Sequence, residues 1–557
     1  MMYAVKIFKY STMICLIAIL YSSLAPDSIA MSKQSDTAIK AVLPFIVPKI
    51  KEPKFPNNTF NITDYGAVGD GHTKNTDAFA KATKACAEAG GGKVIVPAGL
   101  WLTGPIQLKS NLNLHVEQGA VVLFSPEFED YPLLRKTWEG LAAVRCMSPI
   151  YGENLKNIAI TGHGIFDGNG QAWRPVKRFK MTDRQWRTLL RSGGALDDEG
   201  KIWWPSQGAL QGEQIAAELN KRNADVSEYA AAKQYLRPVL VGLTNCSGVL
   251  LDGPTFQNSP AWNIHPMMCE NMIIRNITVL NPWWSQNGDG LDIESCKNVI
   301  VYNCHFDVGD DAICMKSGKD EYGRRRGKPT ENVAIWDCTV YHGHGGFVIG
   351  SEMSGSIRNI YIKNCSFLGT DIGIRFKSTR GRGGIVENIY IQDIRMKDIP
   401  TEAIGFNLFY EKTPPSPEES LDYETDPVTE ETPRFQNIFM KNIICSGAAN
   451  AIYIQGLPEM PVKNVQFENI TISANTGVTC IETEGIKFKN VKIITNKNPA
   501  FGLYNSRNII LENIELPKLT SSIKAAGRKT TGIYVEKGAF EKIEHGKDIK
   551  PDAIIKK

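Results

Sequence analysis

One short pattern recurs along most of this chain and limits what it can fold into. An Asn followed by Ile, Val or Met stands inside runs rich in Ile and Val, and neighbouring copies are separated by steps such as 27, 34 and 29 residues. Each run alternates apolar and polar residues, which is typical of a β-strand with one buried face. The repeated pairs begin at Asn157, Asn271, Asn298, Asn332, Asn359, Asn388, Asn437, Asn464 and Asn508.

A repeat of this length, with short strands and no long helix, predicts one coil of a parallel β-helix. A single coil cannot bury its apolar face, whereas stacked coils form a continuous core. The recurring Asn suits a turn, and stacked copies could form a ladder of side chains. Cys304, Cys338 and Cys365 each follow an Asn or Asp, and we interpret them as small buried residues stacked on one another. A β-sandwich with accidental spacing is the alternative.

Other segments interrupt or flank the repeat. Residues 76–89 have helical spacing, with Thr76 or Asp77 as the cap, and we expect this helix to cover the N-terminal end of the solenoid. A charged, helix-leaning insertion spans about 172–236 and holds four tryptophans, and an acidic, Pro-rich loop spans about 411–434. We therefore place a linker at 31–58, the β-helix at 59–517 and a Lys-rich tail at 518–557.

The N-terminus has the form of an export signal. Lys6 and Lys9 precede a short apolar run at 11–24, and Ser28-Ile29-Ala30 is a small-x-small site, so residues 1–30 match a cleaved signal peptide. We expect a secreted or periplasmic protein with no stable membrane insertion after cleavage; an uncleaved anchor is the alternative. The formal net charge of +4 is too small to indicate a nucleic-acid partner. The sequence does not fix the oligomeric state.

Polar motifs recur at about one coil of spacing. Asp289 and Asp292 stand on one coil and the adjacent Asp310 and Asp311 on the next, and His344 stands between glycines on a third. Arg375-Phe376-Lys377 follows one step later. Because equivalent positions of successive coils are stacked, we expect these motifs to form one surface stripe.

The stripe has more than one interpretation. Asp-Gly pairs are ordinary turn residues, and Asp-rich turns can hold calcium, although the spacing of an EF-hand is missing. Close carboxylates raise the pKa of one partner, which suits an acid–base pair. An Arg/Lys pair can hold the carboxylate of an acidic sugar. We expect the site to need no metal ion or other cofactor.

With these motifs, the chain resembles glycoside hydrolase family 28, the polygalacturonases. Four family signatures occur in order: NGD in place of NTD at 287–289, GDD at 309–311, GHG at 343–345 and RFK in place of RIK at 375–377. The segment 61–79 and Asn258-Ser259-Pro260 are also similar to the family. The resemblance covers about residues 60–515, and four motifs in order at coil spacing make it specific.

The resemblance implies a right-handed parallel β-helix that hydrolyses α-1,4-galacturonosyl bonds with inversion, with polygalacturonate or a pectic oligosaccharide as substrate. Asp310 would be the general acid, and Asp289 and Asp311 would activate the attacking water. His344 would tune the protonation of Asp310. The expected substrate-binding residues are Arg375, Lys377, Asn287 and, on the following coil, Tyr410.

The sequence does not decide between exo and endo action, or between polygalacturonate and other substrates. The run 318–328, with Arg324, Arg325 and Arg326, resembles a stretch of bacterial exo-acting members and could hold a terminal carboxylate; a solvated basic loop is the alternative. The 172–236 insertion and its tryptophans could wall the groove into a pocket. We therefore favour exo action over endo action. A hydrolase of another galacturonate-containing glycan such as rhamnogalacturonan, a pectate lyase and a non-catalytic glycan-binding β-helix remain as alternatives.

Overall fold

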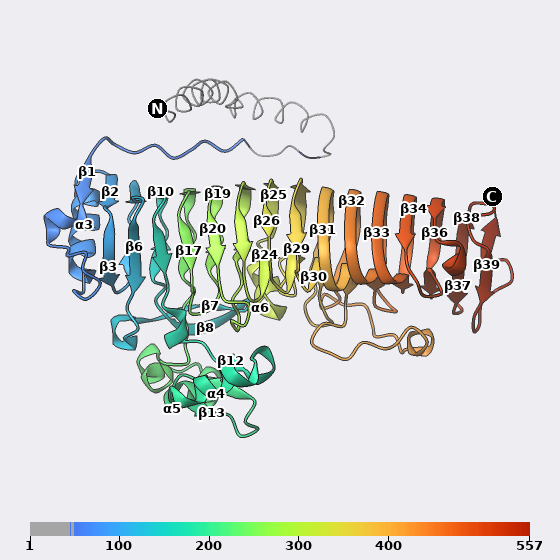
Figure 1. Cartoon of the computed structure of the whole chain (residues 1–557), viewed down its shortest axis with the longest axis horizontal. Coiled ribbons are helices and arrows are strands. Elements are labelled where there is room, and N and C mark those ends of the chain that lie inside the picture. Colours follow the sequence, from blue (N-terminus) through green and yellow to red (C-terminus); the bar gives the residue numbers. More distant parts are fainter. Residues whose placement is uncertain (1–44, 46–48, 557) are drawn as a thin grey trace, which may run out of the picture. The chain divides into compact units, whose positions relative to one another are not determined.

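The computed structural model describes Phe45 and residues 49–556. Pro48–Lys557 form one compact unit, a solenoid of stacked coils that extends from α3 (Thr76–Glu88) at one end to β39 (Lys542–His545) at the other (Figure 1). The expected signal peptide at 1–30 and most of the expected linker lie outside the described residues. Among the residues that are described, no helix combines the length and apolar character needed to cross a membrane.

The solenoid confirms the predicted all-β fold, a right-handed parallel β-helix, and its coils contribute strands to three parallel ladders. The first ladder contains the Asn-anchored strands and begins with β1 (Thr59–Asn61) against β2. Its members are β2 (Gly92–Val96), β5 (Leu112–Val116), β10 (Lys156–Gly162), β16 (Ser247–Asp252), β19 (Glu270–Arg275), β22 (Lys297–Tyr302), β25 (Thr330–Trp336), β28 (Ile357–Lys363), β31 (Ile385–Asn407), β32 (Arg434–Gln455), β33 (Val462–Ile481), β34 (Thr483–Ile494), β36 (Arg507–Glu515), β38 (Thr531–Val535) and β40 (Ile554–Lys556).

The second and third ladders follow in the same order along each coil, and the long strands β31, β32 and β33 bend through more than one ladder. The second ladder holds β3 (Gly99–Thr103), β6 (Ala120–Phe124), β11 (Ile165–Asp167), β17 (Thr255–Gln257), β20 (Thr278–Leu280), β23 (His305–Asp307), β26 (Thr339–Val340) and β29 (Ser366–Leu368). The third holds β4 (Ile106–Gln107), β9 (Ile150–Glu153), β15 (Val241–Thr244), β18 (Ile264–Met267), β21 (Leu291–Glu294), β24 (Asp311–Lys316), β27 (Gly345–Ile349), β30 (Ile372–Lys377), β35 (Phe501–Tyr504), β37 (Ser522–Ala526) and β39 (Lys542–His545).

The repeated asparagines form the predicted ladder. Asn298 Nδ2 donates to Asn271 Oδ1 at 3.1 Å, and Asn332 donates to Asn298 in the same way at 3.2 Å. Each of these residues has a positive φ near 57°, a conformation that Asn tolerates better than most side chains. The Asn therefore serves both the turn and the stacking of coils.

The cysteines are core residues, as predicted. Cys304, Cys338 and Cys365 are buried in one apolar cluster with the inward Ile, Val and Phe residues of the coils. All eleven cysteines of the described chain are buried and none forms a disulfide. Burial raises the pKa of the Cys338 thiol well above its ordinary value, so this thiol stays protonated and unreactive.

Helix α3 (Thr76–Glu88) closes the N-terminal end of the core with Phe79, Ala82 and Cys86, as expected. The expected cap is wrong in detail. Asn75 precedes the helix, and Thr76 Oγ1 instead accepts a hydrogen bond from Gly104 N at 2.7 Å. Thr76 therefore ties the first turn of the helix to the coil below it.

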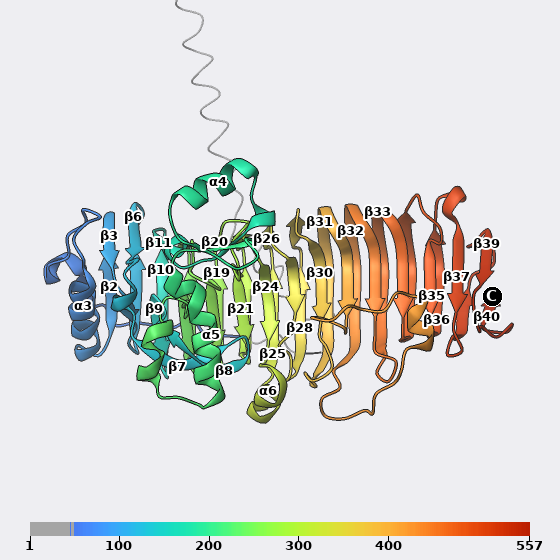
Figure 2. The same ribbon diagram turned by 90° about the horizontal axis from the view of Figure 1, so that it is seen from below.

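Two additions lie on one side of the solenoid (Figures 1 and 2). An antiparallel hairpin consists of β7 (Leu133–Trp138) and β8 (Leu141–Cys146). The 172–236 insertion contains α4 (Asp183–Arg191), α5 (Gln207–Lys221) and a small antiparallel sheet of β12 (Val176–Lys177), β14 (Ile202–Trp204) and β13 (Ala195–Leu196). Its tryptophans are mainly internal: Trp173 packs against Tyr131, and Trp186 and Trp203 share a second small core.

The C-terminal boundary needs correction. The coils continue past 517, because β37 to β40 extend the first and third ladders to Lys556. Residues 518–556 of the expected tail at 518–557 are therefore part of the solenoid and not a separate tail. The 411–434 loop, drawn in orange below β31 in Figure 1, is pinned to these last coils by the ion pairs Glu418–Lys524 and Asp422–Lys547.

The remaining helices are short. One is α6 (Asp320–Arg326), directly after β24. The others are 3-10 turns: η1 (Ile62–Tyr65), η2 (Phe128–Asp130), η3 (Gly170–Ala172), η4 (Arg178–Lys180), η5 (Val226–Ala232), η6 (Glu419–Asp422) and η7 (Lys518–Thr520).

Candidate active site

The third ladder brings the four sequence motifs together. Strands β21, β24, β27 and β30 are consecutive neighbours in it. The main chain fixes the alignment, because Gly290 N donates to Asp311 O at 2.9 Å and His344 N donates to Asp310 O at 2.9 Å. The stripe expected from the spacing therefore exists, and it runs across four adjacent coils.

Three carboxylates meet at its centre. One oxygen from each of Asp289, Asp310 and Asp311 lies within 4.8 Å of the others. Asp289 and Asp311 are buried and Asp310 is half-buried. A metal ion could bind such a triad, but several basic side chains around it already balance its charge. These are Lys316, His344, Arg375 and Lys377.

Asp310 is paired with His344. The His344 Nδ1 atom lies 3.0 Å from Asp310 Oδ1, and its Nε2 atom lies 3.8 Å from Asp371 Oδ2. Burial lowers the pKa of His344, but the hydrogen bond and the charge of Asp310 outweigh it and raise that pKa overall. Burial alone would raise the pKa of Asp310, but the hydrogen bond and the charge of His344 outweigh burial, and the pKa of Asp310 lies well below its ordinary value. The pair therefore holds one proton, stored on the imidazole.

Asp311 is paired with the basic motif of β30. Lys377 Nζ donates to Asp311 Oδ2 at 2.7 Å, and Arg375 Nη1 lies 3.5 Å from Asp311 Oδ1. Burial alone would raise the pKa of Asp311, but Lys377 and Arg375 lower it overall. Tyr410 joins this group, since its ring centre lies 4.8 Å from Lys377 Nζ and 5.6 Å from the Arg375 guanidinium.

Asp289 has the opposite electrostatic surroundings. Burial and the charges of Asp292 and Asp310 raise its pKa well above the ordinary value, and Lys316 Nζ is 4.0 Å away. Asp292, which the sequence reasoning did not assign to the site, lies 3.5 Å from the same Lys316 and has a pKa raised by burial to about 7. These surroundings favour the protonated form of Asp289, whereas those of Asp310 and Asp311 favour the charged form.

Asn287 lies at the edge of the site and is held by a buried arginine. Its Oδ1 accepts from Arg237 Nη2 at 2.8 Å, while Arg237 Nη1 donates to the carbonyl oxygens of Gln286 and Pro260. Arg237 comes from the segment just after the insertion. No motif indicated it, because the contact depends on how the insertion returns to the solenoid.

The insertion also sends a lysine to the triad. Lys180, at the end of η4, is 9% exposed, and its Nζ lies 3.5 Å from the carbonyl oxygen of Gly309. Burial lowers the pKa of Lys180, and the charges of Asp310 and Asp371 act against that lowering. Nothing in the sequence around Lys180 distinguished it from the other basic residues of the insertion.

The three arginines of α6 do not contact the triad. Arg324 donates to the carbonyl oxygens of Gly381 and Arg382 and pairs with Glu431. Arg325 is exposed and pairs with Glu321 in its own helix. Arg326 pairs with the buried Glu294 at 2.5 Å. Each of the three guanidiniums already has a protein partner. This differs from the expectation that the run 318–328 binds a terminal carboxylate of the substrate.

A cavity of about 500 Å³ opens beside Asn287. Its walls come from the hairpin β7–β8, from the insertion and from the returning segment 235–237. Of the four tryptophans of the insertion, Trp204 lines this cavity. The insertion therefore does form a wall next to the site, although three of the tryptophans expected there are packed inside it.

Comparison with known proteins gives consistent matches. Residues 177–487 match the sequence profile of Glycosyl hydrolases family 28, and residues 59–120 match that of Rhamnogalacturonase A/epimerase, pectate lyase-like. The exo-poly-alpha-D-galacturonosidase of Dickeya chrysanthemi is 30% identical over 77% of this chain and 70% of its own length. A probable polygalacturonase of Vitis vinifera is 29% identical over 76% and 77%.

Solved structures show the same pattern. The exopolygalacturonase of Thermotoga maritima is 33% identical with a TM-score of 0.67, and the match covers 80% of this chain and 93% of the other. The family 28 exopolygalacturonase of Yersinia enterocolitica is 23% identical with a TM-score of 0.64, over 82% and 78%.

Proposed function

The chain belongs to the glycosyl hydrolases of family 28, and from this membership we propose that it hydrolyses the α-1,4-galacturonosyl bonds of polygalacturonate from a chain end. The observation that carries the proposal is the triad Asp289, Asp310 and Asp311, which faces the basic pair Arg375 and Lys377. The triad supplies acid–base chemistry, and the basic pair supplies recognition of a sugar carboxylate.

In this proposal Asp310 protonates the leaving oxygen. Its partner His344 stores the proton in the substrate-free enzyme. A bound galacturonate carboxylate neutralises Lys377, whose charge helps to lower the pKa of Asp310, so binding raises that pKa and favours transfer of the proton from His344 to Asp310. Asp310 can then act as the general acid at the glycosidic oxygen.

Asp289 and Asp311 hold the attacking water. Arg375 and Lys377 neutralise Asp311 in the free enzyme, and the substrate carboxylate takes over part of this contact when it binds. Asp311 is then a stronger base for the water. Asp289, beside Lys316 and Asp292, accepts the water's second hydrogen bond. Tyr410 packs against the basic pair and limits its motion.

We propose inversion of the anomeric carbon, as the family resemblance implies. Two-carboxylate inverting sites usually separate the groups by about 6.5–9.5 Å, more than the 4.8 Å limit found for the nearest oxygens of this triad. In our scheme the attacking water is held between Asp289 and Asp311. It therefore does not have to fit into a gap between the general acid and a single general base. Proton NMR of the first product tests this: the β-anomer indicates inversion and the α-anomer excludes it.

Exo action is supported by the walled cavity beside Asn287 and by the exo-acting proteins among the relatives. The test is a time course of products from de-esterified polygalacturonate, resolved by length. Monomer or dimer from the start, with slow loss of viscosity, is the expected result. A ladder of intermediate oligomers would indicate endo action in an open groove.

The same assay separates the other candidates. Products that absorb in the ultraviolet would indicate a lyase, and no cleavage would direct the search to another galacturonate-containing glycan such as rhamnogalacturonan. We also propose that the enzyme acts after export, secreted or periplasmic, because its polymeric substrate lies outside the cytoplasm. Detection of the mature protein without residues 1–30 in an extracellular or periplasmic fraction tests this.

A further inference from the structure

Arg145 on β8 is a buried cation that forms no ion pair with any described residue, although the charge of Glu139 raises its pKa slightly. It is 9% exposed, and within the described chain its guanidinium has neither a hydrogen bond nor an ion pair; its Nε has no acceptor. It lies 4.0 Å from the ring centre of Trp138 and 5.7 Å from that of Tyr235. Burial lowers the pKa of Arg145 to about 10, so it remains charged at neutral pH.

The neighbouring Arg237 provides a contrast. It is equally buried, but it donates to three oxygens, those of Pro260, Gln286 and the side chain of Asn287. Its role in holding Asn287 explains its position. Arg145 has no such explanation, because its only partners are aromatic rings on which it is stacked.

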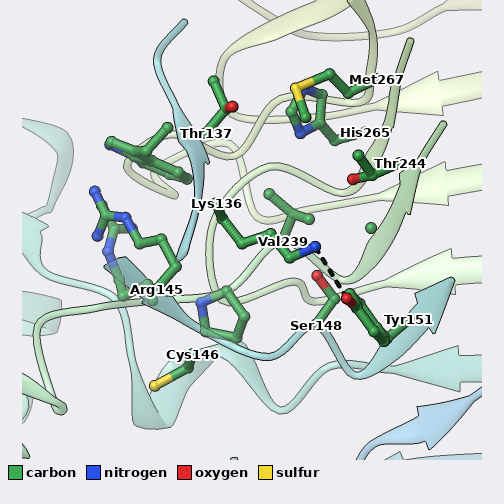
Figure 3. Close-up of a pocket in the computed structure, with 14 residues that line it drawn as sticks. Lys136, Thr137, Arg145, Cys146, Ser148, Tyr151, Val239, Thr244, His265 and Met267 are labelled. Carbon is green, nitrogen blue, oxygen red and sulfur yellow. Dashed lines mark hydrogen bonds between the residues drawn. The ribbon is translucent and has the colours of Figure 1, made fainter. Parts of the chain in front are cut away.

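Arg145 faces two adjoining cavities. Trp138, Arg145 and Arg237 line both the 500 Å³ cavity beside Asn287 and a small cavity of about 40 Å³. Figure 3 shows the small one, with Arg145 on one side and Tyr151, His265 and Met267 on the other. The larger cavity contains one more cation, Lys177, and two carboxylates, Glu139 and Glu213, neither of which pairs with Arg145.

A buried charge without a partner is unfavourable, and buried charges in proteins are usually paired, so an unpaired guanidinium on a cavity wall is open to an anionic ligand. A guanidinium matches the two oxygens of a carboxylate, and an adjacent indole offers a flat surface to the apolar face of a sugar ring. The cavity lies on the Asn287 side of the triad, while Arg375 and Lys377 lie on the opposite side, two coils further along. The site therefore has a basic group on each side of the triad.

We propose that Arg145 binds the carboxylate of the terminal galacturonate of the substrate, in the cavity between the hairpin and the insertion. This inference rests on the proposed function and adds a requirement: the terminal residue must carry a free carboxylate. A methyl ester or a neutral galactose at that end lacks the charge that Arg145 needs, so the enzyme discriminates against both.

The test uses Arg145→Met, Arg145→Lys and the matched control Arg528→Met, which removes an exposed arginine of the last coils. The substrates are trigalacturonate and the same trimer with a methyl ester on its terminal residue. Wild type should prefer the free acid by at least about tenfold in kcat/KM. Arg145→Met should lose about 10- to 100-fold on the free acid, mostly through KM, as for loss of a charge-assisted bond. Arg145→Met should cleave the free acid and the methyl ester with similar kcat/KM.

Thermal unfolding separates this role from a structural one. Because Arg145 has no anionic partner, Arg145→Met should unfold at the same temperature as wild type or a higher one, and Arg145→Lys should keep part of the preference for the free acid. Arg528→Met should match wild type throughout. A lowered unfolding temperature in Arg145→Met, or unchanged kinetics, would overturn the inference. If wild type itself fails to cleave polygalacturonate, the proposed function fails instead.

Discussion

The coils of the solenoid and the segments that interrupt them contribute different kinds of residues to the site. Every charged group that the coils supply has a partner of opposite charge: Asp310 has His344, and Asp311 has Lys377. The interrupting segments supply Arg145, which forms no ion pair within the described part of the chain, and Lys180, whose Nζ lies 3.5 Å from a carbonyl oxygen. The comparison indicates that the coils position the catalytic groups before substrate binds, and that the interrupting segments supply basic groups that pair with the substrate.

The largest effect should come from a coil residue. Asp310→Asn removes the proposed acid while keeping its shape, and reducing-sugar release from polygalacturonate should fall by at least about 10³-fold, within the range of acid–base catalysis. The unfolding temperature should stay close to that of wild type. The control is Asp371→Asn, a more exposed carboxylate 3.8 Å from His344, which should keep activity within about threefold. Substantial activity in Asp310→Asn would remove this residue from the acid role.

The coils could be predicted from the sequence because their contacts repeat. An Asn that hydrogen-bonds to the Asn one coil below leaves a periodic signal, and so do the inward Ile and Val residues. The triad, His344, Arg375 and Lys377 were found for the same reason, since stacking brings equivalent positions together. Asp292 stands in the same motif as Asp289, but the sequence did not indicate that it belongs to the site, because its contact with Lys316 depends on burial.

The interruptions could not be predicted in this way. Arg145, Arg237 and Lys180 reach the site through non-repeating segments whose paths the sequence does not specify. Proximity in sequence was misleading for Arg324, Arg325 and Arg326, because α6 turns its guanidiniums toward Glu431, Glu321 and Glu294. The last coils were missed because β37 to β40 are strands of only three to five residues, and three of them, β37, β39 and β40, carry a Lys residue.

A second coil variant should change the pH dependence more than the maximum rate. The raised pKa of His344 keeps the Asp310–His344 pair supplied with a proton above pH 6.5, and activity should fall on the alkaline side when that proton is lost. In His344→Gln, Asp310 must keep its own proton, and a carboxyl group loses it at lower pH than an imidazole. The alkaline limb of kcat/KM should therefore move to lower pH, with about a tenfold loss near pH 6.5.

This shift is measured from pH 3 to 9 with wild type and His342→Gln as references. His342 is an exposed histidine two residues away that contacts Asp307 instead of the triad. An alkaline limb that stays in place in His344→Gln would show that His344 does not supply the proton.

A residue from the insertion should have a smaller effect. Lys180→Met removes a cation that favours the ionised form of Asp310 and attracts a uronate substrate. We expect a rise in KM of about three- to tenfold with little change in stability, because burial already disfavours the charged lysine. Lys221→Met, an exposed lysine of α5 in the same insertion, is the control and should match wild type. A loss confined to kcat would instead place Lys180 with the coil residues, in the chemistry itself.

The smallest effect on activity should come from a buried carboxylate on a coil far from the triad. Glu482 is 2% exposed, accepts from Asn505 and Lys529, and has a pKa raised by burial to about 7. The folded protein therefore keeps a proton on Glu482 up to about pH 7, while the unfolded chain loses it near its ordinary value of 4.5. Folding takes up this proton between the two values, so stability falls as pH rises through that window.

Glu482→Gln keeps the neutral form at every pH and should avoid this loss. Compared with wild type, it should gain about 1–3 kcal/mol between pH 4.5 and 8, seen as a gain of a few °C in unfolding temperature, with turnover unchanged. The neighbouring Glu484→Gln should behave oppositely, because the hydrogen bond from Arg507 lowers the pKa of Glu484 and stabilises its charged form at higher pH. If Glu482→Gln lowered turnover, buried charge would matter on coils other than the four that carry the site motifs, and the distinction between coils and interrupting segments would not hold.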